Sequence, residues 1–297
     1  MKSFSIIIPS FNSMSYIKAT IDALIALDYD KNLIEVIIVD DGSTDDSFNY
    51  INNLISPYPW IKQIHKSNSN WGGVLNYVKK HHLIKHEIVS VLDSDDQYLA
   101  HTLKLVDQKI GNYDIFAGAF YRFNGSKKTR KFRPYWFFFK RVLTNKKQMH
   151  SPYCLPLPYF FKSDLFNQLE DLRENVAFQD PDFLSQMIQK ANSLIFSKKA
   201  VGLYYYKRPN NSRSVEWDYE KRFEPELYAC YRLIANGASE CVSYRLNVKS
   251  FAKLAAKQQI RFEISEKLQF KWFPWFLRWI YWLIFLIKQK KFFKKVK

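Results

Sequence analysis

The sequence predicts an α/β protein with a mostly parallel sheet, helices on both sheet faces and a helical C-terminal tail. Two observations predict this class: short, continuously apolar segments alternate with amphipathic helical patterns through the first hundred residues, and acidic residues directly follow two of the apolar segments. The chain has 297 residues and is 47% hydrophobic, which is enough for a packed core. Disordered, collagen-like and repeat architectures are thereby excluded.

Strands and helices alternate regularly in the first part of the chain. Ser13 is the expected N-cap of the first helix, and Ser43 or Thr44 is the expected N-cap of the second. Short connections between buried strands indicate a parallel sheet, in which ligands bind beyond the carboxyl ends of the strands. The expected strands are 4–9, 33–39, 61–65 and 87–92, and the expected helices are 13–27, a segment after Gly42 that includes Phe48 to Ile55, and 71–85.

The second part of the chain has a looser pattern. It predicts a strand at 115–123, a helix at 181–190, a further strand at 204–206 and one or two helices within 225–257. A boundary near residue 220 would separate a domain of residues 1–220 from a tail of residues 221–297. The three cysteines form no CxxC pair, so we expect a reducing compartment without a disulfide framework or a zinc site.

Positive charge is concentrated in two segments. The chain has 45 Lys and Arg against 28 Asp and Glu, a net charge of +17, yet residues 115–163 contain no acid and the last ten residues add six lysines. Such a surplus is typical of proteins with a polyanionic partner, which can be a nucleic acid, an anionic membrane face or a phosphorylated substrate.

Residues 270–287 are almost wholly apolar and precede the C-terminal lysines. The run after Pro274 is shorter than the 20 or so residues of a membrane span, and it contains Arg278. We therefore expect an interfacial helix at about 270–291 on the cytoplasmic face of the membrane, peripheral or monotopic, with a short tilted span and an ordinary core helix as alternatives. The expected membrane-contacting residues are Trp272, Trp275, Arg278, Trp279, Trp282, Lys288, Lys290 and Lys291.

A basic and aromatic stretch covers residues 127–147. RNA-binding surfaces also combine bases with aromatic rings. In the same chain as a tryptophan-rich helix, however, this stretch is better explained by a membrane surface, where it would help to admit a lipid-linked acceptor. A disordered surface loop is the alternative, and we expect no nucleic-acid partner.

Three carboxylates lie within the four residues Asp93-Ser94-Asp95-Asp96, directly after an apolar strand. Carboxylates this close repel one another unless a cation is present, and Mg²⁺ or Mn²⁺ bound to a diphosphate would remove that cost. The alternative is a solvated turn. A second pair, Asp40-Asp41, ends another strand at the same sheet edge. The sequence has neither a GxGxxG after the first strand nor a P-loop, so a nucleotide site here would depend on a metal.

Four separated motifs resemble those of glycosyltransferase family 2, which has the GT-A fold, a Rossmann-like α/β fold. PSFN (9–12), VDDGSTD (39–45), LDSDD (92–96) and FQDPDF (178–183) are similar in order and spacing to that family's motifs. The resemblance covers roughly residues 4–215. It implies a nucleotide-sugar half at about 1–113, an acceptor half at about 114–220, and inverting transfer from a nucleotide sugar to an acceptor hydroxyl, as in bacterial cell-surface glycan synthesis.

Residue roles follow from the resemblance alone. Phe11 would stack on the donor base, Asp41 would bond the polar edge of the base, and Pro9 and Asn12 belong to the same donor-binding motif. Asp93 would contact the ribose or the metal, Asp95 would ligate the metal, and Asp180 would be the general base, with Asp182 as an alternative. Arg208 would approach the diphosphate, unless it is a solvated loop charge.

Two residues depart from the family pattern: Phe11 replaces a tyrosine and Gln179 replaces a glutamate. The leading hypothesis is a metal-dependent transferase that uses a UDP-hexose or UDP-N-acetylhexosamine and extends a glycan, with a lipid-linked glycan as one option. A polyprenyl-phosphate glycosyltransferase and a non-catalytic nucleic-acid or membrane binding protein remain alternatives. The sugar, the linkage and the oligomeric state stay open.

Overall fold

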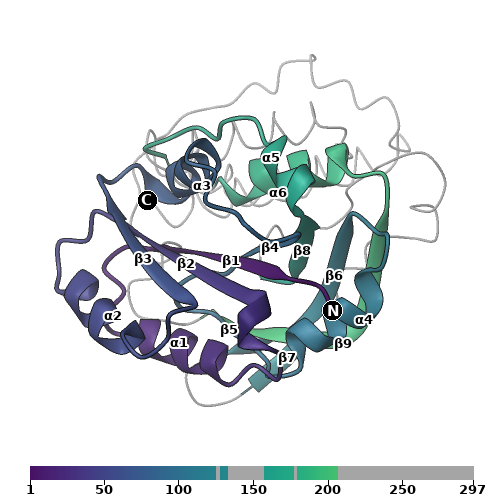
Figure 1. The fold of residues 1–297 in the computed structure, drawn as a ribbon, viewed down its shortest axis with the longest axis horizontal. Coiled ribbons are helices and arrows are strands. Elements are labelled where there is room, and N and C mark those ends of the chain that lie inside the picture. The colour runs from purple at the N-terminus through teal and green to yellow at the C-terminus, as the bar shows by residue number, and fades with distance from the viewer. Residues whose placement is uncertain (125–127, 133–156, 177–178, 207–297) are drawn as a thin grey trace, which may run out of the picture.

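The computed structural model describes residues 1–124, 128–132, 157–176 and 179–206 (Figure 1). These residues form one sheet with the strand order β3-β2-β1-β4-β8-β6-β9-β5, and β7 pairs with β6. The strands are β1 (Phe4–Ser10), β2 (Ile34–Asp41), β3 (Ile61–Lys66), β4 (Ile88–Val91), β5 (Gln97–Tyr98), β6 (Ile115–Phe123), β7 (Lys128–Phe132), β8 (Tyr159–Lys162) and β9 (Leu194–Tyr205).

The N-terminal half of the sheet is parallel, as the alternating pattern predicts. β1 pairs in parallel with both β2 and β4, and β2 pairs in parallel with β3. The expectation of a mostly parallel sheet is wrong for the other half, because β8 lies antiparallel between β4 and β6, while β9 runs parallel to β6 and antiparallel to β5. The sheet is therefore mixed.

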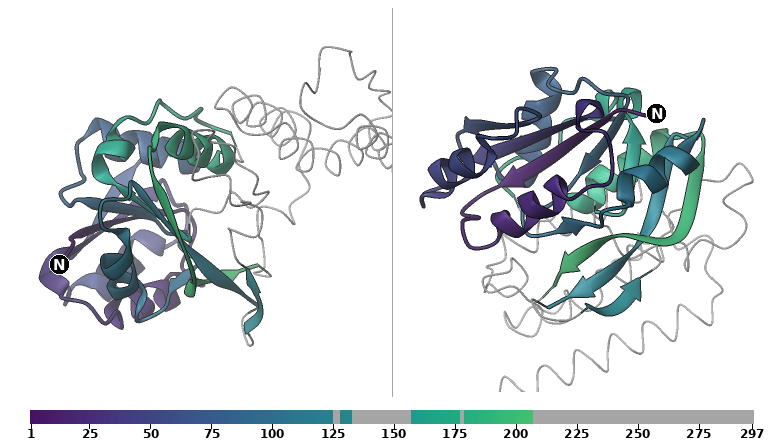
Figure 2. Two further views of the ribbon diagram at one scale, coloured as in Figure 1. Left: turned by 90° about the vertical axis from the view of Figure 1, so that its right-hand side faces the viewer. Right: turned by 60° about the horizontal axis from the view of Figure 1, so that its bottom comes forward.

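Helices cover both faces of the sheet, and each face has its own hydrophobic core (Figures 1 and 2). Side chains of β1 alternate between the two cores: Phe4, Ile6 and Ile8 enter the first core, and Ile7 enters the second. The first core takes residues from α1 (Ile17–Ile25), α2 (Ser47–Ile55) and α4 (Thr102–Ile110). The second takes residues from α3 (Asn70–Lys80), α5 (Ser163–Asn167) and α6 (Asp180–Lys190).

Two helices begin later than their expected caps. The hydroxyl of Ser13 is hydrogen-bonded to the hydroxyl of Ser10 at 2.7 Å, and α1 begins only at Ile17. The hydroxyl of Ser43 donates to Asp40, and the backbone N–H of Thr44 donates to Asn12 Oδ1 at 2.8 Å, so α2 begins at Ser47. These hydroxyl residues build the strand-end loops and do not cap the helices.

Other boundaries also differ from the expected ones. α3 ends at Lys80, five residues early, and His82 has a positive φ of 50° that ends the helix. The predicted strand at 204–206 is the end of the longer β9. The elements α4, α5, β5, β7 and β8 were not expected from the pattern. The helices expected within 225–257 and the tail helix lie outside the described residues.

Candidate active site

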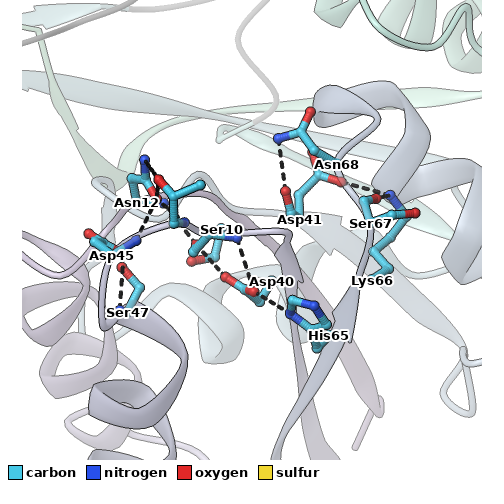
Figure 3. A network of polar contacts seen from close by, with 12 residues as sticks. Ser10, Asn12, Asp40, Asp41, Asp45, Ser47, His65, Lys66, Ser67 and Asn68 are labelled. Carbon is cyan, nitrogen blue, oxygen red and sulfur yellow. Dashed lines mark hydrogen bonds and ion pairs between the residues drawn. The ribbon is translucent and has the colours of Figure 1, made fainter.

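A network of polar contacts connects the carboxyl ends of β1 and β2 (Figure 3). Asp40, at the end of β2, is fully buried, and it accepts hydrogen bonds from the backbone N–H and the hydroxyl of Ser43. The oxygen that accepts the backbone N–H of Ser43 also lies 2.7 Å from Nδ1 of His65 on β3. A buried carboxylate needs such partners, so Asp40 holds the loop after β2 in place.

Asp41 is also buried, with 3% of its surface exposed, and it is held by the loop after β3. One carboxylate oxygen lies 2.7 Å from Nζ of Lys66 and accepts the backbone N–H of Ser69 at 3.0 Å. The backbone carbonyl of Asp41 accepts from the side chain of Asn68 at 2.8 Å. Lys66 and Ser69 therefore fix the position of the Asp41 carboxylate at the end of β2.

The first motif is joined to the second through Asn12. Asn12 has a φ of 47°, its side-chain oxygen accepts the backbone N–H of Thr44, and its own backbone N–H donates to the hydroxyl of Ser43 at 2.9 Å. Pro9 is buried within β1. Phe11 is 46% exposed, which leaves an aromatic ring at the surface of this sheet edge.

The loop after β4 carries the acidic cluster of Asp93, Asp95 and Asp96. One carboxylate oxygen from each of the three lies within 4.8 Å of the other two. The indole N–H of Trp71 donates to Asp93 at 2.9 Å, and the backbone N–H of Tyr205 donates to Asp96 at 2.9 Å. The Thr20 hydroxyl donates to the Ser94 and Asp96 carbonyls, at 2.9 and 2.8 Å. Contacts from α1, α3 and β9 thus hold this loop.

The chemistry of these donors fits a hard divalent cation. Three carboxylates converge on one point, and Mg²⁺ and Mn²⁺ prefer carboxylate and phosphate oxygens. Tyr98, at the base of the loop, is fully buried; burial is the main cause that raises the pKa of its hydroxyl, and the nearby carboxylates of Asp96 and Asp93 raise it further. The hydroxyl therefore stays neutral beside the cluster.

The helix that begins at Asp180 packs against the start of α3. The side-chain amide of Gln179 lies so close to Gly72 that a Cβ there would be 3.0 Å from its nitrogen, and it donates to the Arg173 carbonyl at 2.8 Å. The Trp71 ring meets Phe183 of α6 edge to face, with centroids 5.5 Å apart. Trp71 therefore touches both the acidic cluster and the helix of the expected base.

Asp180 and Asp182 lie in different environments. Asp180 is the first residue of α6 and is partly exposed. Asp182 is 3% exposed, and its carboxylate accepts the side-chain amide of Gln186 at 3.3 Å. Only the carboxylate of Asp180 thus combines exposure with a place at the start of the helix.

A hollow of about 650 Å³ lies between the end of β3, α3 and the segment that contains Asp171 and Glu174. Lys66 and Ser69, which hold Asp41, line one side of this hollow, and Lys79 and Glu174 line another. None of the three clustered aspartates lines it, so it is separate from the expected metal site.

The remaining predicted site residues lie outside the described residues. These are Arg208 and the tail residues Trp272, Trp275, Arg278, Trp279, Trp282, Lys288, Lys290 and Lys291. Within the part of the chain that the structure describes, no helix combines the length and the apolar character needed to cross a membrane.

Sequence reasoning missed several residues that build the site. Trp71 was expected only as the first residue of a helix, and Lys66, His65 and Tyr205 were given no role, although all four bind acidic residues of the motifs. The available signal was their position at the end of a strand or at the start of a helix, where ligands bind in sheets of this kind.

Comparison with known proteins gives the family. The profile described as glycosyl transferase family 2 matches residues 5–169, more than half of the chain. The uncharacterized glycosyltransferase MG060 of Mycoplasma genitalium is 35% identical over 276 residues, which cover 91% of each chain. TarS of Staphylococcus aureus, named a poly(ribitol-phosphate) β-N-acetylglucosaminyltransferase, is 31% identical over 105 residues, which are 35% of this chain and 18% of TarS.

Solved structures share the fold. TarS residues 1–349 in complex with UDP-GlcNAc superpose with a TM-score of 0.64 at 21% identity, over 90% of this chain and 77% of that one. The mannosyltransferase PcManGT of Pyrobaculum calidifontis, in complex with GDP-Man and Mn²⁺, gives a TM-score of 0.53 at 16% identity, over 97% of this chain and 87% of that one. The chain therefore belongs to glycosyltransferase family 2, and it is a glycosyltransferase with a fold of the GT-A type.

Proposed function

We propose that the enzyme moves a sugar, with inversion, from a UDP-hexose or UDP-N-acetylhexosamine to a hydroxyl of a growing cell-surface glycan. One observation carries this proposal: Trp71 contacts both Asp93 of the acidic cluster and Phe183 of the helix that begins at Asp180. This contact supports a single site in which carboxylates suited to a cation on a diphosphate act together with a carboxylate suited to accept a proton.

The donor would bind across the ends of β1, β2 and β4. The exposed ring of Phe11 offers a stacking surface for the base, and Asp41 offers an oxygen to its polar edge. Asn12, which binds the backbone of Thr44, and Pro9, which is buried in β1, would hold the loops at this edge in position. Asp93 and Asp95 would hold Mg²⁺ or Mn²⁺, and the ion would offset the charge that develops on the departing diphosphate.

The transfer step needs a proton acceptor. The acceptor hydroxyl oxygen attacks the anomeric carbon from the side opposite the diphosphate, the bond from that carbon to the diphosphate oxygen breaks, and the hydroxyl proton passes to Asp180. This displacement inverts the anomeric centre. We assign the base to Asp180 because Asp182 is buried and bonded to Gln186.

The acceptor and the location are further parts of the proposal. The likeness to TarS, whose name gives a poly(ribitol phosphate) acceptor, supports a cell-surface polymer or glycoconjugate as the acceptor. The tryptophans and lysines of residues 270–291 would anchor the enzyme to the anionic cytoplasmic face of the membrane. If reversing the charge of Lys288, Lys290 and Lys291 left binding to anionic vesicles unaltered, this anchor would be rejected.

A panel of nucleotide sugars tests the donor and the metal together. We expect one UDP-sugar to raise the melting temperature in the presence of Mn²⁺ and to be hydrolysed or transferred, and Asp95→Asn to abolish both effects. Asp22→Asn is the matched control, because Asp22 is an exposed carboxylate paired with Lys18 on α1. Salt-dependent RNA binding without any effect of a nucleotide sugar would contradict the proposal.

A further inference from the structure

The chain that connects α5 to α6 passes beside α3 (Figure 1). We name its described part the 169–176 segment; the expected general base, Asp180, follows it as the first residue of α6. The segment contains neither helix nor strand, so its backbone groups need partners other than those of regular structure. The side chains that supply these partners therefore determine where the segment lies.

One face of α3 holds this segment. Gly72, Asn76 and Lys79 are spaced four and three residues apart, which places them on the same side of the helix. A Cβ on Gly72 would lie 3.0 Å from the Cβ of Leu172, so the glycine allows the segment to approach the helix closely. The ammonium group of Lys79 donates to the backbone carbonyl of Leu169 at 2.7 Å.

Asn76 makes the central contact between α3 and the segment. Its side-chain oxygen accepts the backbone N–H of Leu172 at 2.9 Å, and its side-chain nitrogen donates to the backbone carbonyl of Leu172 at 2.8 Å. The same nitrogen donates to the carboxylate of Glu174 at 3.1 Å. Asn76 and Leu172 are both buried, so removing the amide would leave buried backbone groups without their partner.

The segment is in turn bonded to α6. The side-chain amide of Gln179, the residue before the helix, donates to the backbone carbonyl of Arg173 at 2.8 Å. The side-chain oxygen of Gln186 accepts the backbone N–H of Glu170 at 2.8 Å. Both glutamines are buried. A shift of the segment would therefore shift the start of α6, where Asp180 lies.

The segment is also connected to the donor side of the site. The backbone N–H of Ser69 donates to the carboxylate of Asp41 at 3.0 Å, and the backbone carbonyl of Ser69 accepts the N–H of Asn175 at 3.0 Å. The side chain of Asn70 donates to the carbonyl of Val176 at 3.3 Å. The start of α3 thus lies between the aspartate expected to bind the nucleobase and the segment that leads to the expected general base.

We propose that Asn76 is a positioning residue for glycosyl transfer: by holding the 169–176 segment on α3, it sets the place of Asp180 relative to the bound donor. Asn76 acts through Asp180, because the segment it holds is bonded to α6. This inference rests on the proposed function, since it takes Asp180 as the general base. Accurate placement matters for such a group, because a displacement of about 1 Å can cost about a hundredfold in rate.

Substitution of Asn76, alone and together with Asp180, tests the inference. With Mn²⁺ and the UDP-sugar that the donor panel selects, we expect Asn76→Ala to lower kcat about tenfold to a hundredfold. The dissociation constant of the donor should stay within about twofold, because the contact between Ser69 and Asp41 is kept. In the Asp180→Asn background, Asn76→Ala should change kcat by less than about twofold, since the group it positions no longer accepts a proton. Equal reductions of kcat in both backgrounds would overturn the inference.

Ser5→Ala is the matched control for lost stability. Ser5 is buried near the amino end of β1, opposite the end that carries the site. Its hydroxyl donates to Glu35 and accepts the backbone N–H of His86 at 3.2 Å. Both variants remove a buried polar side chain and should lower the melting temperature, but Ser5→Ala should keep kcat. If Ser5→Ala lowered kcat as much as Asn76→Ala does, the inference would fail, because lost stability would explain both results.

Hydrogen exchange of the full-length protein tests the physical step directly. In Asn76→Ala, but not in Ser5→Ala, the backbone amides of residues 169–176 and of the start of α6 should exchange faster than in the wild-type enzyme. Unchanged exchange in these residues would contradict the inference. Should Asn76→Ala not fold, Asn76→Asp takes its place with the same expectations, because it keeps the size of the side chain and the acceptor but removes the N–H donors to Leu172 and Glu174.

The activity of the wild-type enzyme distinguishes the two ways in which the inference can fail. If the wild-type enzyme neither hydrolyses nor transfers any nucleotide sugar, the proposed function fails and the inference fails with it. If the wild-type enzyme is active and Asn76→Ala keeps its kcat, only the role of Asn76 is rejected.

Discussion

The indole N–H of Trp71 donates a hydrogen bond to the carboxylate of Asp93 at 2.9 Å, although 22 residues separate them. The same side chain packs edge to face on Phe183, so a single residue touches the acidic cluster and the helix of the expected base. A hydrogen bond to a charged group fixes the orientation of the carboxylate that receives it.

We expect Trp71→Phe to keep the packing and lose the hydrogen bond. Loss of a hydrogen bond to a charged group costs about 1.5–3 kcal/mol, so the Mn²⁺ concentration for half-maximal activity should rise at least about tenfold. Trp60→Phe, at the edge of β3 beside Lys31, is the control. A Trp71→Phe enzyme that is less stable but has an unchanged metal requirement would show that Trp71 acts only in packing.

Asp180→Asn tests the general base. We expect kcat to fall about 10²–10⁴-fold, the usual contribution of base catalysis, while the dissociation constant of the donor stays the same. In Asp182→Asn we expect the melting temperature to fall and kcat to be largely kept, because Asp182 is buried and bonded to Gln186. Single-turnover rates and thermal unfolding of both variants decide between the two aspartates.

Phe11→Ala tests donor stacking. Stacking of a base on an aromatic ring is worth about 1–3 kcal/mol, so the dissociation constant of the UDP-sugar should rise about tenfold to a hundredfold. Phe11 is 46% exposed, and the melting temperature should barely change. Met14→Ala removes a side chain that is 44% exposed in the same loop and should leave donor binding intact. Equal effects of the two variants would contradict a stacking role.

Gly42→Ala tests the loop that presents Asp41. Gly42 has a φ of +72°, and a Cβ there would lie 2.8 Å from the backbone nitrogen of Asn68. Gly111 has a φ of +45° with nothing within 4 Å of its Cβ position. Both alanine variants should lose at least about 1 kcal/mol of unfolding free energy through backbone strain. Only Gly42→Ala should also weaken UDP-sugar binding, and calorimetric titration of both variants checks this.

Tyr98→Phe tests the alkaline sensitivity of the fold. Burial raises the pKa of Tyr98 above its ordinary value of 10.0, so its proton is bound more tightly in the folded chain than in the unfolded one. The resulting stabilisation is complete below pH 10 and is lost as pH rises above 10, where the unfolded chain ionises. Denaturant unfolding between pH 8 and 11 should show a shallower decline in Tyr98→Phe, and identical slopes would contradict this.

Local patterns predicted the half of the fold that β1 to β4 build. Apolar runs such as FSIIIPS are buried on both faces and can only be central strands, and the helical stripe with Ile51 and Ile55 packs as expected. The antiparallel insertion of β8 between β4 and β6 could not be predicted, because strand order depends on contacts between Val89 and Phe161, which are far apart in the sequence.

The amino-acid sequence by itself determined that acidic residues follow parallel strands, since buried strands must end where polar residues begin. It therefore placed Asp41 and Asp93 at one sheet edge, and the resemblance to the family motifs assigned Asp180 as the general base of the same site. Only the tertiary structure decided that Lys66 binds Asp41, that Trp71 joins Asp93 to α6, and that Tyr205 binds Asp96. Such contacts join residues from different elements, and their geometry exists only once the strand order and the helix packing are fixed.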